Sequence, residues 1–247
     1  MTAYTRSPER AAGFTLIELA VVLFILTLLL SSLLVPLGTQ INQSNINTTQ
    51  KSLDDVKEAL IGFALANGYL PCPDKTSGPT TGPNDTPNDG AEDVAGGLCV
   101  TQEGNVPWST LGVGSADVWG NRLRYRVVPA FAQRPPGATF SLSSSANLRL
   151  CTTAACTTTL TSSAPNGAPA VILSHGKNGL GAINSVTGAA NPAPSSADEL
   201  ENTNSDTTFV SRAATDIGAG AGEFDDIVAW LSTNILLNRM VAAGKLP

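Results

Sequence analysis

The residue whose type and setting most directly suggest chemistry is Glu18, a carboxylate inside the nearly apolar run Phe14–Val35. A charged carboxylate in hydrocarbon costs on the order of 2.5 kcal/mol or more, so such a group is expected to find a partner. No lysine or arginine lies one helical turn away on either side. A cut between Gly13 and Phe14 would free an α-amino group that could neutralise the carboxylate. These residues therefore indicate chain processing and ion pairing.

The residues that could support catalysis are few. His175 is the single histidine, so acid–base catalysis near neutral pH would depend on it. Ser174 is its neighbour, but adjacent residues of a strand point to opposite faces. The sequence contains no G-x-S-x-G motif, and the tract 176–178 (GKN) lacks the preceding glycine of a phosphate loop. We therefore expect no enzyme activity and place His175 in a turn.

The four cysteines form two neighbouring sets. An even number of cysteines in a chain with a membrane segment is typical of disulfides in an oxidising compartment. Closeness in sequence favours the pairs Cys72–Cys99 and Cys151–Cys156, and two other pairings stay open. A zinc site is not expected, because there is no C-x-x-C motif and the lone histidine is not spaced as a ligand.

The segment 74–97 is rich in Pro, Gly, Asn and Asp, and its acidic side chains could in principle bind calcium. An EF-hand is excluded, because a proline occupies the third ligand position and no glutamate closes the loop. We expect a solvated loop, too polar to bury, with no metal or other cofactor. The acids concerned are Asp85, Asp89, Glu92 and Asp93.

The elements that carry these residues begin with a membrane-length segment. As a helix, Phe14–Val35 would rise about 33 Å, and a bilayer core is roughly 30 Å thick. Arg6 and Arg10 precede the run, so the leader is expected in the cytoplasm and the rest of the chain outside it. A cleaved secretory signal would have a shorter apolar core. A plain signal-anchor helix remains the alternative.

A polar, amphipathic stretch follows and predicts that the helix continues to Asn67. Pro36, closely followed by Gly38, is expected to bend it. Gly68 and Pro71 are expected to stop it. The apolar residues that recur at helical spacing in its second half are Ile46, Leu53, Val56, Leu60 and Phe63.

The rest of the chain reads as a small β-rich head. Leu123, Tyr125 and Val127 alternate on one face of an expected strand. Arg122, Arg124 and Arg126 take the other face, which we expect to be solvated, with a contact surface as the alternative. Two short strands are expected around the loop 151–156, further strands at 169–179 and 224–232, and a turn of helix at 196–202. Ser232 and Gly244 are expected to cap a closing helix.

The stretch GFTLIEL, Gly13–Leu19, resembles the processing site of type IV pilins and of the pseudopilins of type II secretion systems. The resemblance implies prepilin cleavage after Gly13, methylation of the new terminus Phe14, and a role for Glu18 in filament assembly. The stretch DVWGNRLRYRV resembles a segment of the major pseudopilin. Some pseudopilins also bind calcium in a loop near the C-terminus. The expected terminal helix departs from many pilins.

The fold class we predict is α+β: a long N-terminal helix packed on a small antiparallel sheet, with a short C-terminal helix. The expected parts are the following: a leader peptide at 1–13, a transmembrane half-helix at 14–38, an amphipathic periplasmic half at 39–70 and a head at 71–247, with long loops at 74–97 and 181–222. The head is expected in the periplasm, on a single-pass inner-membrane anchor.

The function we predict is that of a structural filament subunit, a pilin or pseudopilin. Its partners would be the prepilin peptidase/N-methyltransferase and other subunits. Alternatives are a minor pilin acting as an adhesin or binding tip, and a membrane-tethered periplasmic enzyme. A net charge of −6 argues against nucleic-acid binding, apart from a local patch at Arg122–Arg126. The sequence leaves open whether the filament is a type IV pilus or a secretion pseudopilus.

Overall fold

The structure is a computed structural model. It describes residues 13–80, 82, 85–137 and 139–246, and for residues 31–37 the backbone alone. The leader with Arg6 and Arg10, and the side chain of Pro36, therefore lie outside the described residues. The chain forms two compact units, Met1–Asn45 and Ile46–Pro247.

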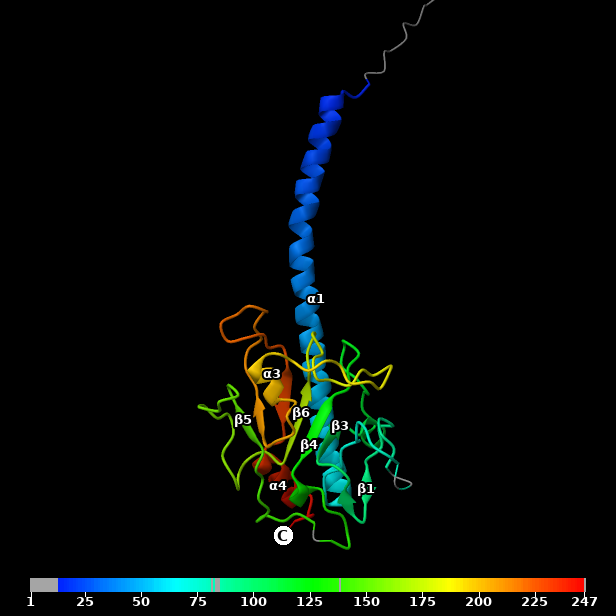
Figure 1. The fold of residues 1–247 in the computed structure, drawn as a ribbon, viewed down its shortest axis with the longest axis vertical. Coiled ribbons are helices and arrows are strands. Elements are labelled where there is room, and N and C mark those ends of the chain that lie inside the picture. The colour runs from blue at the N-terminus through cyan, green and yellow to red at the C-terminus, as the bar shows by residue number, and fades with distance from the viewer. Residues whose placement is uncertain (1–12, 81, 83–84, 138, 247) are drawn as a thin grey trace, which may run out of the picture. The chain divides into compact units, whose positions relative to one another are not determined.

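The first element is helix α1 (Leu16–Asn67), and the remaining elements belong to the second unit (Figure 1). They follow in chain order as β1 (Val94–Ala95), β2 (Leu98–Cys99), β3 (Glu103–Asn105), α2 (Trp108–Leu111), β4 (Arg124–Val127), the 3-10 turn η1 (Pro129–Phe131), β5 (Arg149–Cys151), β6 (Ala170–Ser174), α3 (Ala197–Glu201), β7 (Thr208–Val210), β8 (Ile227–Trp230) and α4 (Thr233–Ala242). The predicted α+β class, with a long N-terminal helix, an antiparallel sheet and a short C-terminal helix, is confirmed.

The part of α1 in the second unit packs by the predicted apolar pattern. Leu53, Val56 and Leu60 are buried in the core, whereas Ile46 and Phe63 at the ends of the pattern are half-buried. Helix α1 ends at Asn67, immediately before the glycine that was predicted to stop it. Gly68 adopts a φ of 86°, in the region that favours glycine, and its N–H donates to Ala64 O at 2.7 Å.

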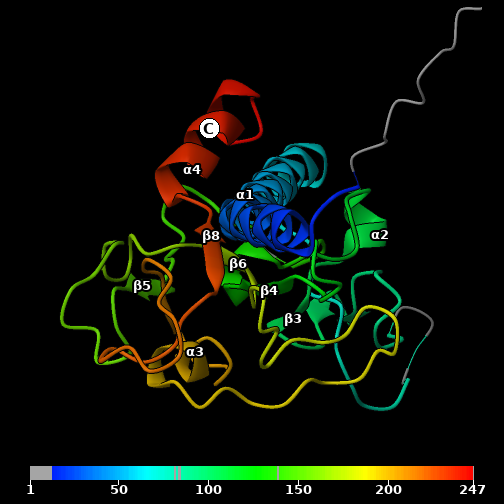
Figure 2. The ribbon, with the colours of Figure 1, turned by 90° about the horizontal axis from the view of Figure 1, so that it is seen from above.

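The main sheet has the order β3-β4-β6-β8, with every pair antiparallel (Figure 2). Tyr125, Ile172 and Ala229 stand opposite one another across three strands, so their side chains share a face. Tyr125 is fully buried on that face, and its hydroxyl donates to Pro71 O, just after α1, at 3.1 Å. The alternation predicted for the strand is therefore confirmed, and this face packs against α1 (Figure 2).

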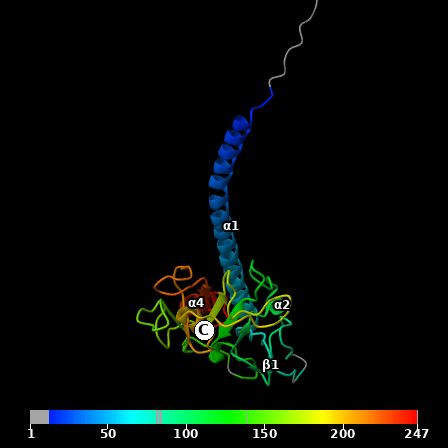
Figure 3. The same cartoon turned by 45° about the horizontal axis from the view of Figure 1, so that its top comes forward.

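The opposite face of the sheet carries the row Glu103, Arg126, Val171 and Trp230, one residue from each strand. A separate parallel pair, β5 with β7, and helix α3 belong to the long connections of the chain (Figure 1). Helices α4 and α2 lie on either side of the head portion of α1 (Figures 2 and 3).

The predictions for the smaller elements are mostly confirmed. The strands expected within 169–179 and 224–232, the turn of helix at 196–202 and the closing helix are all present as β6, β8, α3 and α4, and β6 ends earlier than expected, at Ser174. The prediction of two strands around the loop 151–156 is wrong. In the part of the chain that the structure describes, β5 precedes that loop and a single bridge, Cys151 to Thr159, closes it. β5 forms its ladder with β7 instead, in parallel, so the segment after the loop does not add a second strand.

Candidate functional site

The N-terminal candidate site begins immediately before α1. Gly13 has no atom within 4 Å of where a Cβ would lie, and the side chain of Phe14 is 81% exposed. The peptide bond between them is therefore open to another molecule within the described structure. Glu18 lies in the first turn of α1, three residues after Thr15.

Thr15 and Glu18 cap the start of this helix reciprocally. Thr15 donates to Glu18 Oε2 twice, from its backbone N–H at 2.9 Å and from its hydroxyl at 2.7 Å. The backbone N–H of Glu18 donates to Thr15 Oγ1 at 3.3 Å. This is a capping box, in which side chains satisfy the free N–H groups of the first turn. The capping box gives Glu18 a hydrogen-bond partner within its own chain. Its T-x-x-E spacing is visible in the sequence, so the box could have been predicted.

The capping box does not neutralise the charge of Glu18. Among the described residues, no lysine or arginine forms an ion pair with it. The apolar side chains that follow it, from Leu19 to Leu30, are about half exposed. Within the described residues, no helix has an apolar stretch long enough to cross a membrane. The last five residues of the predicted span Phe14–Val35 belong to the segment 31–37, whose side chains lie outside the described residues.

The acidic loop 74–97 is only in part the solvated loop that its composition predicted, because residues 77–80, 86, 89, 95 and 96 are exposed but several of its acids are buried. Asp85 and Asp93 are nearly inaccessible, with 2% and 1% of their surface exposed. Lys75 explains both burials, because its ammonium group pairs with Asp85 and its backbone N–H donates to Asp93 Oδ2 at 2.6 Å. Asp74 is buried too, and it accepts the N–H of Asn88 at 2.8 Å. A loop that satisfies its own carboxylates can be buried despite its polarity.

Glu92 and Asp89 take different roles in that loop. Glu92 pairs with Arg134 and accepts the N–H of Cys72 at 3.1 Å, next to the Cys72–Cys99 disulfide. Asp89 is exposed and accepts the N–H of Ala91 at 2.8 Å. Asp85 and Asp93 thus share Lys75 as a partner, whereas Glu92 and Asp89 bond elsewhere.

The arginine row on β4 is also not a solvated face, which corrects our expectation. Arg124 and Arg126 both pair with Glu103 on the neighbouring strand β3, and the Glu103 side chain is only 6% exposed. Arg122 stacks on the ring of Trp108, with its guanidinium carbon 3.8 Å from the ring centroid. Each arginine has a specific partner that is distant in sequence.

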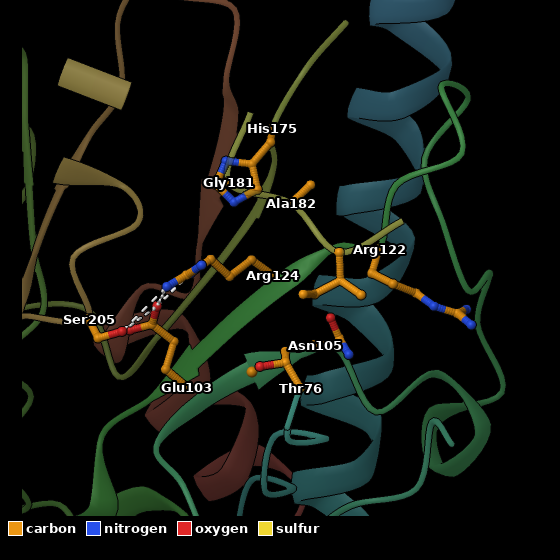
Figure 4. Close-up of a pocket in the computed structure, with 11 residues that line it drawn as sticks. Thr76, Glu103, Asn105, Arg122, Arg124, His175, Gly181, Ala182 and Ser205 are labelled. Carbon is orange, nitrogen blue, oxygen red and sulfur yellow. Dashed lines mark hydrogen bonds and ion pairs between the residues drawn. The ribbon is translucent and has the colours of Figure 1, made fainter. Parts of the chain in front are cut away.

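A small polar pocket of about 110 Å³ lies next to this cluster (Figure 4). Glu103, Arg124 and Ser205 line it on one side, and His175 lines it near Gly181. Figure 4 shows Arg124 directed toward Glu103 and Ser205. The pocket is much smaller than the roughly 300 Å³ or more typical of small-molecule sites, so it can hold a few water molecules or a small ion.

The strongest cluster of ligating side chains lies elsewhere, where α3 approaches the start of β8. One carboxylate oxygen from each of Glu199, Asp225 and Asp226 lies within 4.8 Å of the others. Burial raises the pKa of Glu199 to about 7 and that of Asp225 to about 6, and the charge of Asp226 adds to both increases. Three acids that repel one another in a buried place favour a cation or bound protons.

The protein holds one oxygen of each of these carboxylates in place. Asn178 donates its backbone N–H to Asp225 Oδ2 at 2.8 Å and its side-chain amide to Glu199 Oε1 at 3.1 Å. Asn202 donates to Asp226 Oδ2 at 2.7 Å. Glu199 Oε2 and Asp225 Oδ1 are buried and have no hydrogen-bond partner among the described residues. Carboxylates oriented in this way fit a hard divalent cation such as calcium.

His175 completes the surroundings of the cluster. Its Nδ1 lies 3.4 Å from Asp226 Oδ1, the ring is buried, and neither nitrogen has a hydrogen-bond partner in the described structure. Ser174 turns away from it and donates its hydroxyl to Asp117 Oδ2 at 2.6 Å. The serine and the histidine therefore do not form a nucleophile–base pair.

The cysteines are joined as closeness in sequence suggested. Cys72 is bonded to Cys99, which ties the end of α1 to the acidic loop, and Cys151 is bonded to Cys156 after β5. No cysteine among the described residues is free.

Comparison with known proteins gives one positive result. The model of the prokaryotic N-terminal methylation motif matches residues 10–34, the segment that contains Gly13, Phe14 and Glu18. This motif is the signature of type IV pilins and pseudopilins. No curated protein and no solved structure matches the chain.

Proposed function

We propose that this protein is a structural subunit of a type IV pilus-like or type II secretion filament, a pilin or pseudopilin. The observation that carries the proposal is the N-terminal methylation motif at residues 10–34, placed at the start of a long helix that leads into a β-rich head. The motif implies an N-terminally anchored subunit, processing by a prepilin peptidase and assembly with other subunits.

The proposed processing step uses the exposed junction before α1. The peptidase cuts between Gly13 and Phe14, removes the leader 1–13, and the α-amino group of Phe14 is methylated. Residues 14–38 then form the membrane-spanning half of the helix, residues 39–70 its periplasmic half, and residues 71–247 the head. Two disulfides support a head in an oxidising compartment such as the periplasm.

The proposed assembly step places Glu18 opposite the Phe14 amine of a neighbouring subunit. In the isolated chain the capping box with Thr15 holds the carboxylate at the helix start. Pairing with an amine adds the charge neutralisation that a hydroxyl and an N–H cannot supply, and in an apolar surrounding that pairing is strongly favoured. The exposed apolar side chains of α1 then pack against those of other subunits.

The test is to express Glu18→Gln in cells that assemble the filament, with Glu58→Gln as the control because Glu58 is an exposed acid further along α1. We expect Glu18→Gln to be cleaved normally but to be reduced at least tenfold in isolated filaments. We expect the control to be incorporated normally. Incorporation of Glu18→Gln at the level of the unchanged protein would refute the assembly role.

We propose, as a second function of the head, that Glu199, Asp225 and Asp226 bind a divalent cation, as some pseudopilins bind calcium near the C-terminus. The support is the set of buried carboxylate oxygens and the shortage of neutralising partners: within the described structure His175 is the single basic side chain paired with the three acids. When bound, the ion would supply positive charge that links α3 to the start of β8. Asn178 and Asn202 would hold the carboxylates in position.

Thermal unfolding of the full chain in detergent, with EDTA and then with excess calcium, tests this proposal. Saturation at about 100 times the dissociation constant would add about 2.7 kcal/mol, and therefore several degrees in Tm. Glu199→Gln should abolish that gain, whereas Glu201→Gln, which changes an acid of the same helix outside the cluster, should keep it. A chain whose Tm is indifferent to calcium and to other divalent ions contradicts the proposal.

A further inference from the structure

His175 follows the last residue of β6 and lies opposite the segment that leads into β8. The register of these antiparallel strands pairs Ser174 with Ile227, so the next pair of the register is His175 and Asp226. Residues that stand opposite each other across antiparallel strands have their side chains on one face, and here Nδ1 of His175 lies 3.4 Å from Asp226 Oδ1. The continuing register therefore brings this histidine to the acid cluster from the side of Asp226.

The ring of His175 is buried without a hydrogen bond. It is 1% exposed, and in the described structure neither nitrogen has a hydrogen-bond partner. The 3.4 Å between Nδ1 and Asp226 Oδ1 is longer than the roughly 2.7–3.2 Å of a protein hydrogen bond from nitrogen to oxygen. Two ligand atoms of one four-coordinate ion, at bond lengths of about 2.1 Å, lie about 3.4 Å apart. The separation therefore fits two ligands of a shared metal ion.

The other acids of the cluster also have free oxygens. Glu199 Oε2 and Asp225 Oδ1 are buried and have no hydrogen-bond partner among the described residues. Gly176 makes room for the second of these oxygens, because its φ is 59° and an added Cβ would lie 2.4 Å from Asp225 Oδ1. The three acids have ligand atoms within 4.8 Å of one another, and His175 adjoins this set at Asp226. A cation that draws the ring inward completes a set of four ligands, one from each side chain.

The nitrogen donor changes which ion this set selects. Calcium and magnesium take oxygen ligands, so the three carboxylates alone would suit calcium. An imidazole nitrogen beside carboxylates is typical of zinc and of other divalent transition-metal ions, and zinc in structural sites takes four ligands. A ligand histidine usually bonds a carbonyl, a carboxylate or water through its second nitrogen. The polar pocket of about 110 Å³ that His175 also lines offers space for such a water (Figure 4).

We propose that His175, Glu199, Asp225 and Asp226 bind a divalent transition-metal ion such as zinc, with the neutral imidazole as the nitrogen ligand. This inference rests on the cation site proposed above and names the class of ion that occupies it. It also revises the expectation from the sequence that no zinc site is present. The four ligands come from the end of β6, from α3 and from the segment before β8, so no short spacing in the sequence indicates them.

The first measurement is a calorimetric titration of the untagged full chain in detergent, after removal of metals with EDTA, with zinc chloride and separately with calcium chloride. We expect zinc to bind at least about 100 times more tightly than calcium. His175→Gln keeps a polar side chain but removes the imidazole, so it should weaken zinc binding at least about 30-fold and calcium binding less than about threefold. Circular dichroism of both proteins in EDTA checks that the variant is folded.

A second measurement needs no change at the buried histidine. Bound manganese(II) is observed by pulsed EPR, in which a hyperfine coupling to an imidazole nitrogen identifies a histidine ligand. The chain contains a single histidine, so this coupling in the untagged protein comes from His175 alone. Glu199→Gln should abolish the coupling, whereas Glu201→Gln, on the same helix and outside the cluster, should keep it.

The results separate this inference from the cation site on which it rests. Zinc that binds no more tightly than calcium, or bound manganese without an imidazole coupling, would overturn the nitrogen ligand and leave the three acids as a calcium site. Failure of every divalent ion to bind would overturn both. Neither result depends on the N-terminal motif or on its processing.

Discussion

The pairing of two arginines with one buried glutamate makes a quantitative prediction for the variant Glu103→Gln. The Glu103 side chain is 6% exposed, and Arg124 and Arg126 are 21% and 16% exposed. Removing one partner of a fully buried ion pair costs about 3–5 kcal/mol. The arginines keep some contact with water and with Ser205, which accepts from both, so we expect a loss of about 2 kcal/mol in the free energy of unfolding.

The matched control is Glu58→Gln, which breaks another glutamate–arginine pair in the same protein. Glu58 and Arg239 join at 2.8 Å, but their side chains are 55% and 48% exposed. Such surface pairs contribute about 0–1 kcal/mol. Both variants keep the shape of the side chain and remove one negative charge, so the difference between them reports the effect of burial.

The assay is thermal unfolding of the full chain in detergent, followed by circular dichroism. For a domain of this size each kcal/mol shifts Tm by about 2–4 °C, so Glu103→Gln should lower Tm by about 4–8 °C and Glu58→Gln by no more than about 4 °C. The reasoning is refuted if the two variants lose the same stability, or if Glu58→Gln loses more.

Two further predictions concern the segment that follows α1. Replacing Cys72 and Cys99 by serine opens a loop with a sequence separation of 27, whereas the same change at Cys151 and Cys156 opens one with a separation of 5. The loop-entropy model gives losses in the free energy of unfolding of about 3.5 and about 2 kcal/mol, respectively. Denaturant titration of both double variants checks this order, and a larger loss for the shorter loop would contradict it. Burial raises the pKa of Asp74 from 3.8 to about 7, so its protonation favours the folded state and this contribution to stability is lost as pH rises from about 4 to about 7. Asp74→Asn should make the fall in stability over that range shallower, as measured by denaturant titration at several pH values; an unchanged slope would show that Asp74 does not titrate there.

Local patterns predicted the elements of this chain well. The alternation of Leu123, Tyr125 and Val127 gave strand β4 and its buried face, because a strand with one buried face repeats every two residues. Gly68 marked the end of α1 because a left-handed backbone conformation favours glycine. These features depend on neighbours in sequence, which the sequence shows directly.

The partners of polar residues could not be predicted in the same way. The arginine face of β4 looked solvated because an alternating pattern identifies a face and not what covers it. Arg124 finds Glu103 on β3 and the carbonyl of Thr203 far along the chain. The composition of the segment 74–97 indicated that its acids were too polar to bury. Their burial could not be predicted, because the pairing of Lys75 with Asp85 depends on how the loop folds back.

The carboxylate cluster shows the same limit most clearly. Glu199 comes from α3, whereas Asp225 and Asp226 precede β8, and the long connection between them has no pattern that brings them together. From the residues of the sequence, calcium was considered only for the acids of the loop 74–97 and no metal was expected there, whereas these three acids come from two separate segments. The amides of Asn178 and Asn202, which orient the cluster, give no signal in the sequence at all. Glu18 was identified because its unusual setting is local.

The measurement that tests the central claim most directly is the intact mass and N-terminal sequence of the protein isolated from its native membrane fraction. A subunit processed through its methylation motif begins at N-methylated Phe14 and lacks residues 1–13. A chain that still begins at Met1, or that is cut at another residue, would contradict the filament-subunit account and leave Glu18 as a helix-capping acid with no role in assembly.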